Sequence, residues 1–216
     1  MHEKSAVIAE VCELITAGSL ERAAALLKAR AGPEATAVSL KQVRESCPRS
    51  ALPPTKRCPT SRALTALFLR DGFVDRYCGE QLVFPGVLRL LSYLLPGEFP
   101  YHPNWKFGVG HPWYWDLYPT VDHEVPVTLQ GPDNMENWRT TSMRLNLVKS
   151  NRLLEDIGWK VVAPGGPDWD GLIGWYVRYL HDQPSLGTIG HLRRWYRAAI
   201  ANGVTQRSAE LDGRKS

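Results

Sequence analysis

Apolar residues recur at helical spacing near both ends of the chain and predict helices there. Residues 4–30 form two such stretches, the first ended by Gly18 and the second capped by Ser19. The sequence Ala-Pro-Gly-Gly-Pro at 163–167 interrupts the chain, and helical spacing resumes beyond it. The predicted helices cover residues 4–30, 61–70, 85–95, 169–181 and 189–202.

Residues 120–134 follow a different pattern, in which an extended stretch gives way to a loop. Pro126 cannot donate a ladder hydrogen bond and biases Val125 towards extended geometry, so a strand is expected to end there. Residues 131–134, Gly-Pro-Asp-Asn, are typical of a loop. Strand and loop together place a small β element inside a helical chain.

A further helix is expected to follow this loop. Its apolar spacing begins at residue 138 or 141 and continues to about residue 156, with Thr140 or Thr141 as the N-cap. The order is therefore strand, loop and helix, flanked by helices on both sides. The expected fold class is α+β and mainly helical.

The strand and the helix of this region carry residues that suit phosphodiester cleavage. Such a reaction needs a base that activates water and a cation that absorbs negative charge. Asp122 and His123 supply a carboxylate and an imidazole side by side in the sequence. The strand, loop and helix would bring Asn146 within reach of both.

The order and spacing of these residues resemble the motif of the HNH endonucleases, also called ββα-metal endonucleases. The resemblance implies a ββα-metal core in which His123 is the general base. It implies that Asp122 and Asn146 hold one divalent cation, Mg²⁺ or Mn²⁺. It also implies that Asn137 clamps the backbone of the loop and keeps the base aimed, a task for which an amide is suited because it both donates and accepts.

The basic residues of the predicted helix are expected to face nucleic acid. Lys149 lies one helical turn beyond Asn146, where it could meet a phosphate, and Arg144 and Arg152 lie nearby. The resemblance implies DNA as the partner, with RNA the less expected one. The expected function is metal-dependent hydrolysis of DNA. The alternative is a nucleic-acid-binding module that keeps the fold and is catalytically silent or controlled by a partner.

A second stretch supports the resemblance and also departs from it. Residues 70–79, which contain Arg-Asp-Gly-Phe and Tyr-Cys-Gly, are similar to the lead-in of HNH proteins. Many HNH proteins then use two Cys-x-x-Cys knuckles to bind a structural zinc. Only Cys78 stands at those positions here, so no structural zinc is expected. We expect apolar packing in its place, by Phe73, Tyr77, Met143 and Leu145.

The motif divides the chain into four parts. Residues 61–160 are the expected nuclease core. Residues 1–40 are a helical N-terminal extension that could pack on the core, form a homodimer or bind a regulatory protein. Residues 41–60 are a basic, proline-containing linker that either follows a phosphate backbone or is solvated. Residues 161–216 are a helical C-terminal extension with a polar tail.

Two further features allow both a functional and a structural interpretation. The aromatic side chains of an insertion at residues 84–119 either stack on bases or fill the core, and we favour the core. Arg193, Arg194 and Arg197 give the last predicted helix a basic side that either contacts DNA or is solvated.

Composition restricts the class of protein without choosing a function. The net charge of +4 is compatible with nucleic acid but does not require it. Four cysteines in 216 residues do not form a disulfide framework, which favours a reducing compartment. The N-terminus does not resemble a signal peptide, and no apolar run has the length of a membrane span. A soluble, cytoplasmic protein without a membrane partner is expected.

Overall fold

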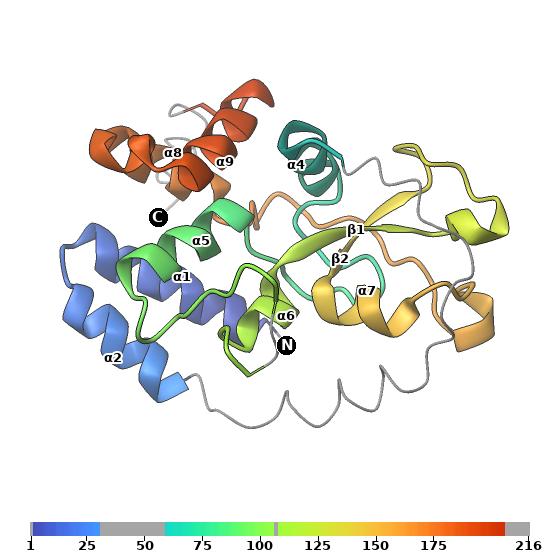
Figure 1. The fold of residues 1–216 in the computed structure, drawn as a ribbon, viewed down its shortest axis with the longest axis horizontal. Coiled ribbons are helices and arrows are strands. Elements are labelled where there is room, and N and C mark those ends of the chain that lie inside the picture. The colour runs from blue at the N-terminus through green and yellow to red at the C-terminus, as the bar shows by residue number, and fades with distance from the viewer. Residues whose placement is uncertain (1, 31–58, 106–107, 206–216) are drawn as a thin grey trace.

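The computed structural model describes residues 2–30, 59–105 and 108–205 (Figure 1). Within these residues the fold is α+β and mainly helical, with one two-stranded antiparallel sheet. None of the helices among them is long and apolar enough to cross a lipid bilayer. Apart from residues 59 and 60, the expected linker at 41–60 lies outside the described residues. The elements are α1 (Glu3–Thr16), α2 (Leu20–Arg30), α4 (Ser61–Arg70), α5 (Pro85–Leu94), α6 (Trp113–Leu117), β1 (Pro119–His123), β2 (Trp138–Ser142), α7 (Met143–Lys149), α8 (Ile173–Asp182) and α9 (Gly190–Ala201).

Helices α1 and α2 form a hairpin that packs into the main core. Gly18 joins them with a φ of +71°, a conformation that glycine adopts without steric cost. Trp175 of α8 donates a hydrogen bond to the hydroxyl of Thr16 at 2.9 Å. The apolar side chains that the hairpin buries are Val7, Ile8, Val11, Ile15, Ala23 and Leu27.

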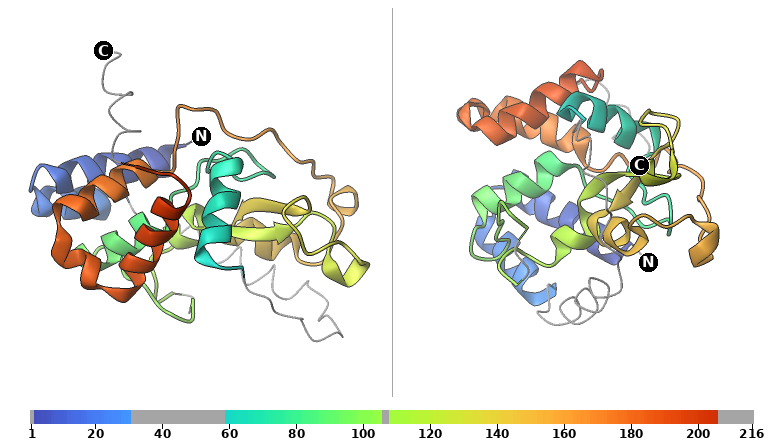
Figure 2. Two further views of the ribbon diagram at one scale, coloured as in Figure 1. Left: turned by 90° about the horizontal axis from the view of Figure 1, so that it is seen from above. Right: turned by 45° about the vertical axis from the view of Figure 1, so that its right-hand side comes forward.

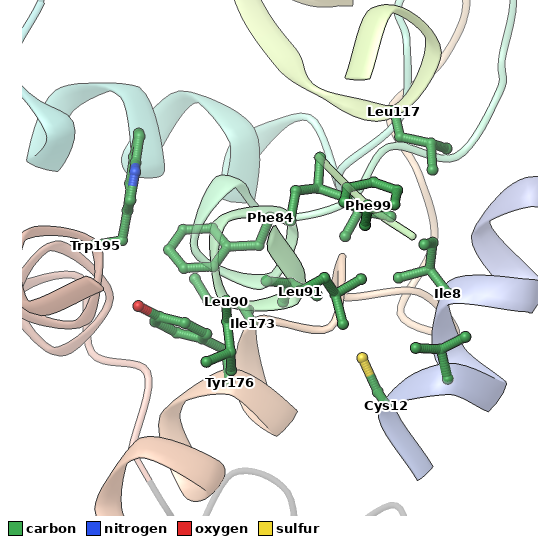
Figure 3. Close-up of a cluster of buried hydrophobic side chains, with 14 of the residues drawn as sticks. Ile8, Cys12, Phe84, Leu90, Leu91, Phe99, Leu117, Ile173, Tyr176 and Trp195 are labelled. Carbon is green, nitrogen blue, oxygen red and sulfur yellow. The ribbon is translucent and has the colours of Figure 1, made fainter. Parts of the chain in front are cut away.

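Helix α5 lies at the centre of the hydrophobic core, and Phe84 fixes its entry (Figure 3). The buried ring of Phe84 meets Tyr176 of α8 at a centroid distance of 5.4 Å and Trp195 of α9 at 5.6 Å, both edge to face. Such pairs stabilise by about 0.5–1.5 kcal/mol beyond the area they bury. One hydrophobic cluster runs from α1 to α9, so both helical extensions share a core with the central part of the chain.

The aromatic side chains that follow α5 pack against one another and against this core. Tyr101, Trp105, Tyr114 and Tyr118 make ring contacts at centroid distances of 5.0–6.1 Å. The guanidinium of Arg89 lies 3.2 Å from the centroid of the Tyr101 ring. These contacts agree with the core-filling interpretation that we favoured from the sequence.

Strand β2 and helix α7 follow one another without a loop. Strands β1 and β2 pair in a register that places His123 opposite Trp138. The side chain of Ser142 caps α7 by accepting a hydrogen bond from the amide of Leu145 at 3.2 Å. The expectation of a helix from residue 138 or 141 to about 156 is therefore wrong at both ends. Residues 138–142 pair with β1 instead, and α7 ends at Lys149.

Two buried carboxylates tie the segment after α4 to β2. Asp75 accepts a hydrogen bond from the amide of Ser142 at 2.7 Å, and Asp71 accepts one from the amide of Thr140 at 2.8 Å. The apolar packing that we expected here is present only in part: Phe73 and Tyr77 are buried, whereas Met143 and Leu145 are half-buried. Hydrogen bonds to Asp71 and Asp75 thus join the apolar contacts in fixing β2 against the segment after α4.

Candidate active site

The β1–β2 sheet lies between α4 and α7, so the side chains of β1 alternate between two environments (Figures 1 and 2). The hydroxyl of Thr120 accepts a hydrogen bond from Asn146 of α7 at 3.0 Å. Thr140 of β2 instead reaches a backbone carbonyl of α4 at 3.5 Å. Because successive side chains of a strand point to opposite faces, Asp122 faces α7 with Thr120, and His123 lies on the other face.

Asp122 is buried against α7 and the segment that precedes α5. Its Oδ2 atom accepts hydrogen bonds from the ammonium of Lys149 at 2.9 Å and from the hydroxyl of Tyr77 at 2.5 Å. Burial raises the pKa of this carboxyl, and the nearby Lys149 and Tyr77 offset only part of that effect. No described residue donates a hydrogen bond to the other carboxylate oxygen, Oδ1.

Lys149 is buried in the structure, although the sequence led us to expect it near a phosphate. None of its surface is exposed, and its ammonium also donates to the backbone carbonyl of His123 at 2.7 Å. A buried lysine needs such partners because an unpaired charge would be costly to desolvate. The expectation of a phosphate contact is therefore corrected for this conformation, in which Lys149 pairs with Asp122.

Asn146 is oriented by its own hydrogen bonds to β1. Its amide nitrogen donates to the hydroxyl of Thr120 at 3.0 Å and to the carbonyl of Val121 at 2.9 Å. These bonds hold both N–H groups of the side chain against the strand, since an amide has two donors and one carbonyl oxygen. That oxygen has no hydrogen-bond partner among the described residues. Asn146 and Asp122 thus both take part in the contact between α7 and β1.

His123 lies at the end of β1, where its imidazole is held from one side. Its Nε2 atom is 2.9 Å from the carboxylate of Asp133 and 3.1 Å from the indole nitrogen of Trp138. The side chain remains 27% exposed, so the ring reaches solvent. The Nδ1 atom makes no hydrogen bond to a described residue.

Asn137 closes the loop between the two strands. Its side-chain oxygen accepts from the amide of Val125, and its nitrogen donates to the carbonyls of Val125 and Pro132, each at 2.9 Å. Gly131 fits beneath this contact, because an added Cβ would lie 1.8 Å from the carbonyl oxygen of Val125. These bonds form the loop clamp that the resemblance implies. Whether the clamp matters for catalysis stays a prediction.

The two arginines that we expected to contact nucleic acid have partners within the chain. Arg144 forms an ion pair with Asp116, which also pairs with Lys4 of α1. Arg152 is exposed, and its guanidinium donates to the backbone carbonyls of Val148 and Lys149. Arg144 is therefore committed to a structural contact, whereas Arg152 remains accessible from solvent.

Three residues of the site were not predicted from the sequence to take part in it. Asp133 and Trp138 position the imidazole of His123, and Tyr77 binds the carboxylate of Asp122. Asp133 lies in the Gly-Pro-Asp-Asn stretch, which signals a loop but not the direction of its side chain. Tyr77 lies 45 residues before Asp122, and no local pattern predicts a contact at that separation.

The oxygen atoms that could hold a metal ion come from two side chains, Asp122 and Asn146. No three His, Cys, Asp or Glu side chains in the described part of the chain gather into a potential metal site. One carboxylate and one amide oxygen suit a hard cation that keeps several waters, as Mg²⁺ does. The donor chemistry therefore fits such an ion, although Lys149 already occupies one oxygen of Asp122.

Comparison with known proteins does not assign this site. No protein-family model matches the sequence, and no curated protein or solved structure gives a significant match. What the chain does must therefore be inferred from the side chains of the site.

Proposed function

We propose that this protein is a metal-dependent endonuclease of the ββα-metal (HNH) type that hydrolyses phosphodiester bonds in DNA. The observation that carries the proposal is the arrangement of three side chains around β1. The side chains of Asp122 and Asn146 both form contacts that join β1 to α7, and the partly exposed His123 follows Asp122 on the other face of the strand. The order of β1, the clamped loop, β2 and α7 supports the proposal.

His123 acts as the general base, and Asp133 is its positioning residue. The indole N–H of Trp138 donates to the carboxylate of Asp133 at 3.0 Å, and this carboxylate, 2.9 Å from Nε2 of His123, then favours the tautomer that carries its proton on Nε2. The lone pair of Nδ1 then points away from this partner and can take a proton from water. Trp138 restricts rotation of the ring, because its indole lies edge-on to the imidazole at a centroid distance of 6.4 Å.

Asp122 and Asn146 would hold the divalent cation. Their oxygen atoms Oδ1 receive no hydrogen bond from a described residue, and both are hard donors of the kind Mg²⁺ and Mn²⁺ bind. When bound, such an ion supplies positive charge to the scissile phosphate and to the leaving 3′ oxygen. The chain itself keeps the amide of Asn146 fixed against β1 through two hydrogen bonds from its nitrogen.

One observation favours a different function. The ammonium of Lys149 already neutralises Asp122, which is the expected arrangement in a protein that keeps this fold without binding a catalytic cation. A catalytically silent module that binds nucleic acid is therefore the second candidate. The two candidates differ in whether the protein cuts DNA.

Incubation of the purified protein with supercoiled plasmid and Mg²⁺ or Mn²⁺ tests the proposal. The wild-type protein is expected to convert the plasmid to nicked or linear forms. His123→Ala should reduce the rate by about 100-fold or more, the usual contribution of a general base. His181→Ala, which changes an exposed histidine of α8, is the matched control and should cut like the wild type.

Unchanged cleavage by His123→Ala would exclude His123 as the base. Binding of DNA by the wild type with no cleavage in either metal would support the silent module instead. Circular dichroism of each variant separates loss of catalysis from loss of folding.

A further inference from the structure

An open hollow of about 430 Å³ lies between the first turn of α4 and one side of α9. Four arginines line it: Arg62 of α4, and Arg193, Arg194 and Arg197 of α9. All four are exposed. The small residues Gly190 and Ala198 form part of the wall, so the hollow admits a group close to the helix backbone. The sequence placed three of these arginines on one helix, and the structure adds the fourth from a distant part of the chain.

The charge of this hollow, which we call the arginine groove, is uncompensated within the described residues. No described carboxylate lines the groove, and none of the four arginines forms an ion pair with a described acidic residue. Arg193 and Arg197 are four residues apart on α9, where like charges repel. Bound anions would relieve this repulsion.

The walls of the groove are fixed relative to one another. Helix α9 is anchored in the core by the buried side chains of Leu192, Trp195 and Ala198. The side chain of Asn202 donates to the carbonyl of Arg62 at 3.1 Å and to that of Ala198 at 2.8 Å, which ties the end of α9 to the start of α4. The arginine side chains therefore extend from a rigid frame, and binding does not require the two helices to be ordered first.

We propose that the arginine groove binds the phosphate backbone of duplex DNA. Guanidinium groups donate paired hydrogen bonds to phosphate oxygens, and several of them on one rigid surface match a polyanion better than a single phosphate. Such contacts carry affinity without reading sequence. The described residues that line the groove are basic, polar or small, and this positive lining suits a continuous phosphate backbone better than a zwitterionic small molecule.

Helix α4 links the groove to the candidate active site. Arg62 lies in its first turn and Arg70 at its last residue, so they are separated by about 12 Å along the helix axis. The guanidinium of Arg70 donates to the backbone carbonyl of Trp138 at 2.7 Å, and Trp138 contacts His123. The separation of about 12 Å between Arg62 and Arg70 corresponds to roughly three to four base pairs of duplex. The inference that the groove directs DNA towards His123 rests on the proposed function, whereas binding in the groove does not.

The test measures anisotropy of a fluorescein-labelled DNA duplex in EDTA, so that binding is observed without cleavage. The variant Arg193→Gln/Arg197→Gln should bind roughly tenfold or more weakly near physiological salt. The slope of log K against log salt concentration should become shallower by about 1.8, because each lost phosphate contact contributes about 0.9. Both side chains are exposed, so folding should be retained.

The matched control is Arg22→Gln/Lys28→Gln, which removes two exposed positive charges from α2. It should leave the salt slope unchanged. An equal loss of DNA affinity in both double variants would mean that only net charge matters and would overturn the proposal that the groove binds DNA. Tighter binding of an RNA duplex of the same length would overturn the assignment to DNA.

Failure of the groove and failure of the nuclease are distinguishable. DNA binding that depends on the groove, together with no plasmid cleavage in Mg²⁺, would contradict the proposed nuclease activity and support DNA binding in the groove. Plasmid cleavage that depends on His123, together with unchanged DNA binding by Arg193→Gln/Arg197→Gln, would support the proposed nuclease activity and contradict DNA binding in the groove.

Discussion

The ammonium of Lys149 lies 2.9 Å from the Oδ2 atom of Asp122, and both side chains are buried at the contact of α7 with β1. The positive charge of Lys149 thus pairs with the carboxylate that we propose as a metal ligand. Lysine and metal ion would compete for the same negative charge. The affinity of Asp122 and Asn146 for a divalent cation should therefore be lower than it would be without Lys149.

Lys149→Met tests this competition. Removing the ammonium should strengthen Mn²⁺ binding at pH 8 by about tenfold, equivalent to about 1.4 kcal/mol, as measured by titration calorimetry. Without metal the variant should lose about 3–5 kcal/mol of stability, because a buried carboxylate is left without its partner. Added Mn²⁺ should then raise the melting temperature of the variant more than that of the wild type.

The exposed Lys160 provides the control for this experiment. Lys160→Met removes the same charge at the surface and should bind Mn²⁺ like the wild type. Equal or weaker Mn²⁺ binding by a folded Lys149→Met variant would show that Lys149 does not compete with the metal.

Asn137→Ala should misalign the imidazole while leaving the helical core intact. The change removes three hydrogen bonds at the base of the loop, each with a net contribution of about 1 kcal/mol. We expect cleavage to fall by about 100-fold, the effect of a misplacement of about 1 Å. Plasmid cleavage rates and chemical denaturation measure the two effects.

Gly131→Ala should reproduce the loss while Asn137 itself is kept, because the new Cβ would collide with the carbonyl of Val125 and lie 3.0 Å from the side-chain nitrogen of Asn137. Gly187 has no atom within 4 Å of a built Cβ, so Gly187→Ala is the control. Full activity in Gly131→Ala would show that the loop tolerates displacement and that the clamp does not aim the base.

Asp133→Asn should lower kcat by about 10- to 100-fold with little change in KM. The substitution keeps the shape of the side chain but removes the charge that favours the Nε2-protonated tautomer of His123. A purely structural role would change stability and KM together. A kcat equal to that of the wild type would remove Asp133 from the mechanism.

Asp71 should make the stability of the protein depend on pH in the acidic range. Burial raises the pKa of its carboxyl, but hydrogen bonds from Arg70 and Thr140 outweigh burial, and its pKa lies below the ordinary value of 3.8. A lowered pKa contributes stability above the ordinary value, and this contribution is lost as the pH falls through the folded-state pKa.

Asp71→Asn should therefore destabilise the protein by about 2–3 kcal/mol at pH 7, and by much less near pH 2.5. Urea denaturation at both pH values measures the difference. Asp156→Asn, at an exposed position, should differ little from the wild type at either pH. A penalty for Asp71→Asn that is the same at pH 7 and pH 2.5 would rule out the ionised carboxylate as the source of stability.

Local patterns predicted the strand that carries Asp122 and His123, the loop after it and the positions of the flanking helices. They succeeded because Pro126, the Gly-Pro-Asp-Asn stretch and the helical spacing of apolar residues act over a few residues. They failed at residues 138–142, whose strand conformation depends on pairing with β1. Propensity alone does not report such pairing.

The partners of the charged residues could not be predicted from the sequence. Lysine is rarely buried, so an exposed Lys149 was the natural expectation, and only the fold brings it against Asp122. Asp75 reaches Ser142 across 67 residues, and Arg62 joins the arginines of α9 across about twice that separation in the chain. Contacts of this kind follow from tertiary packing and leave no periodic signal.

The clamp formed by Asn137 separates two properties of the loop it closes. The base of the loop is fixed beside His123, whereas Val127 and Leu129 at its tip are 46% and 50% exposed. Mutations at the tip would alter the surface offered to a target without moving the imidazole. On the function that we propose, changes at the tip could therefore alter which DNA is bound while the rate of the chemical step is preserved.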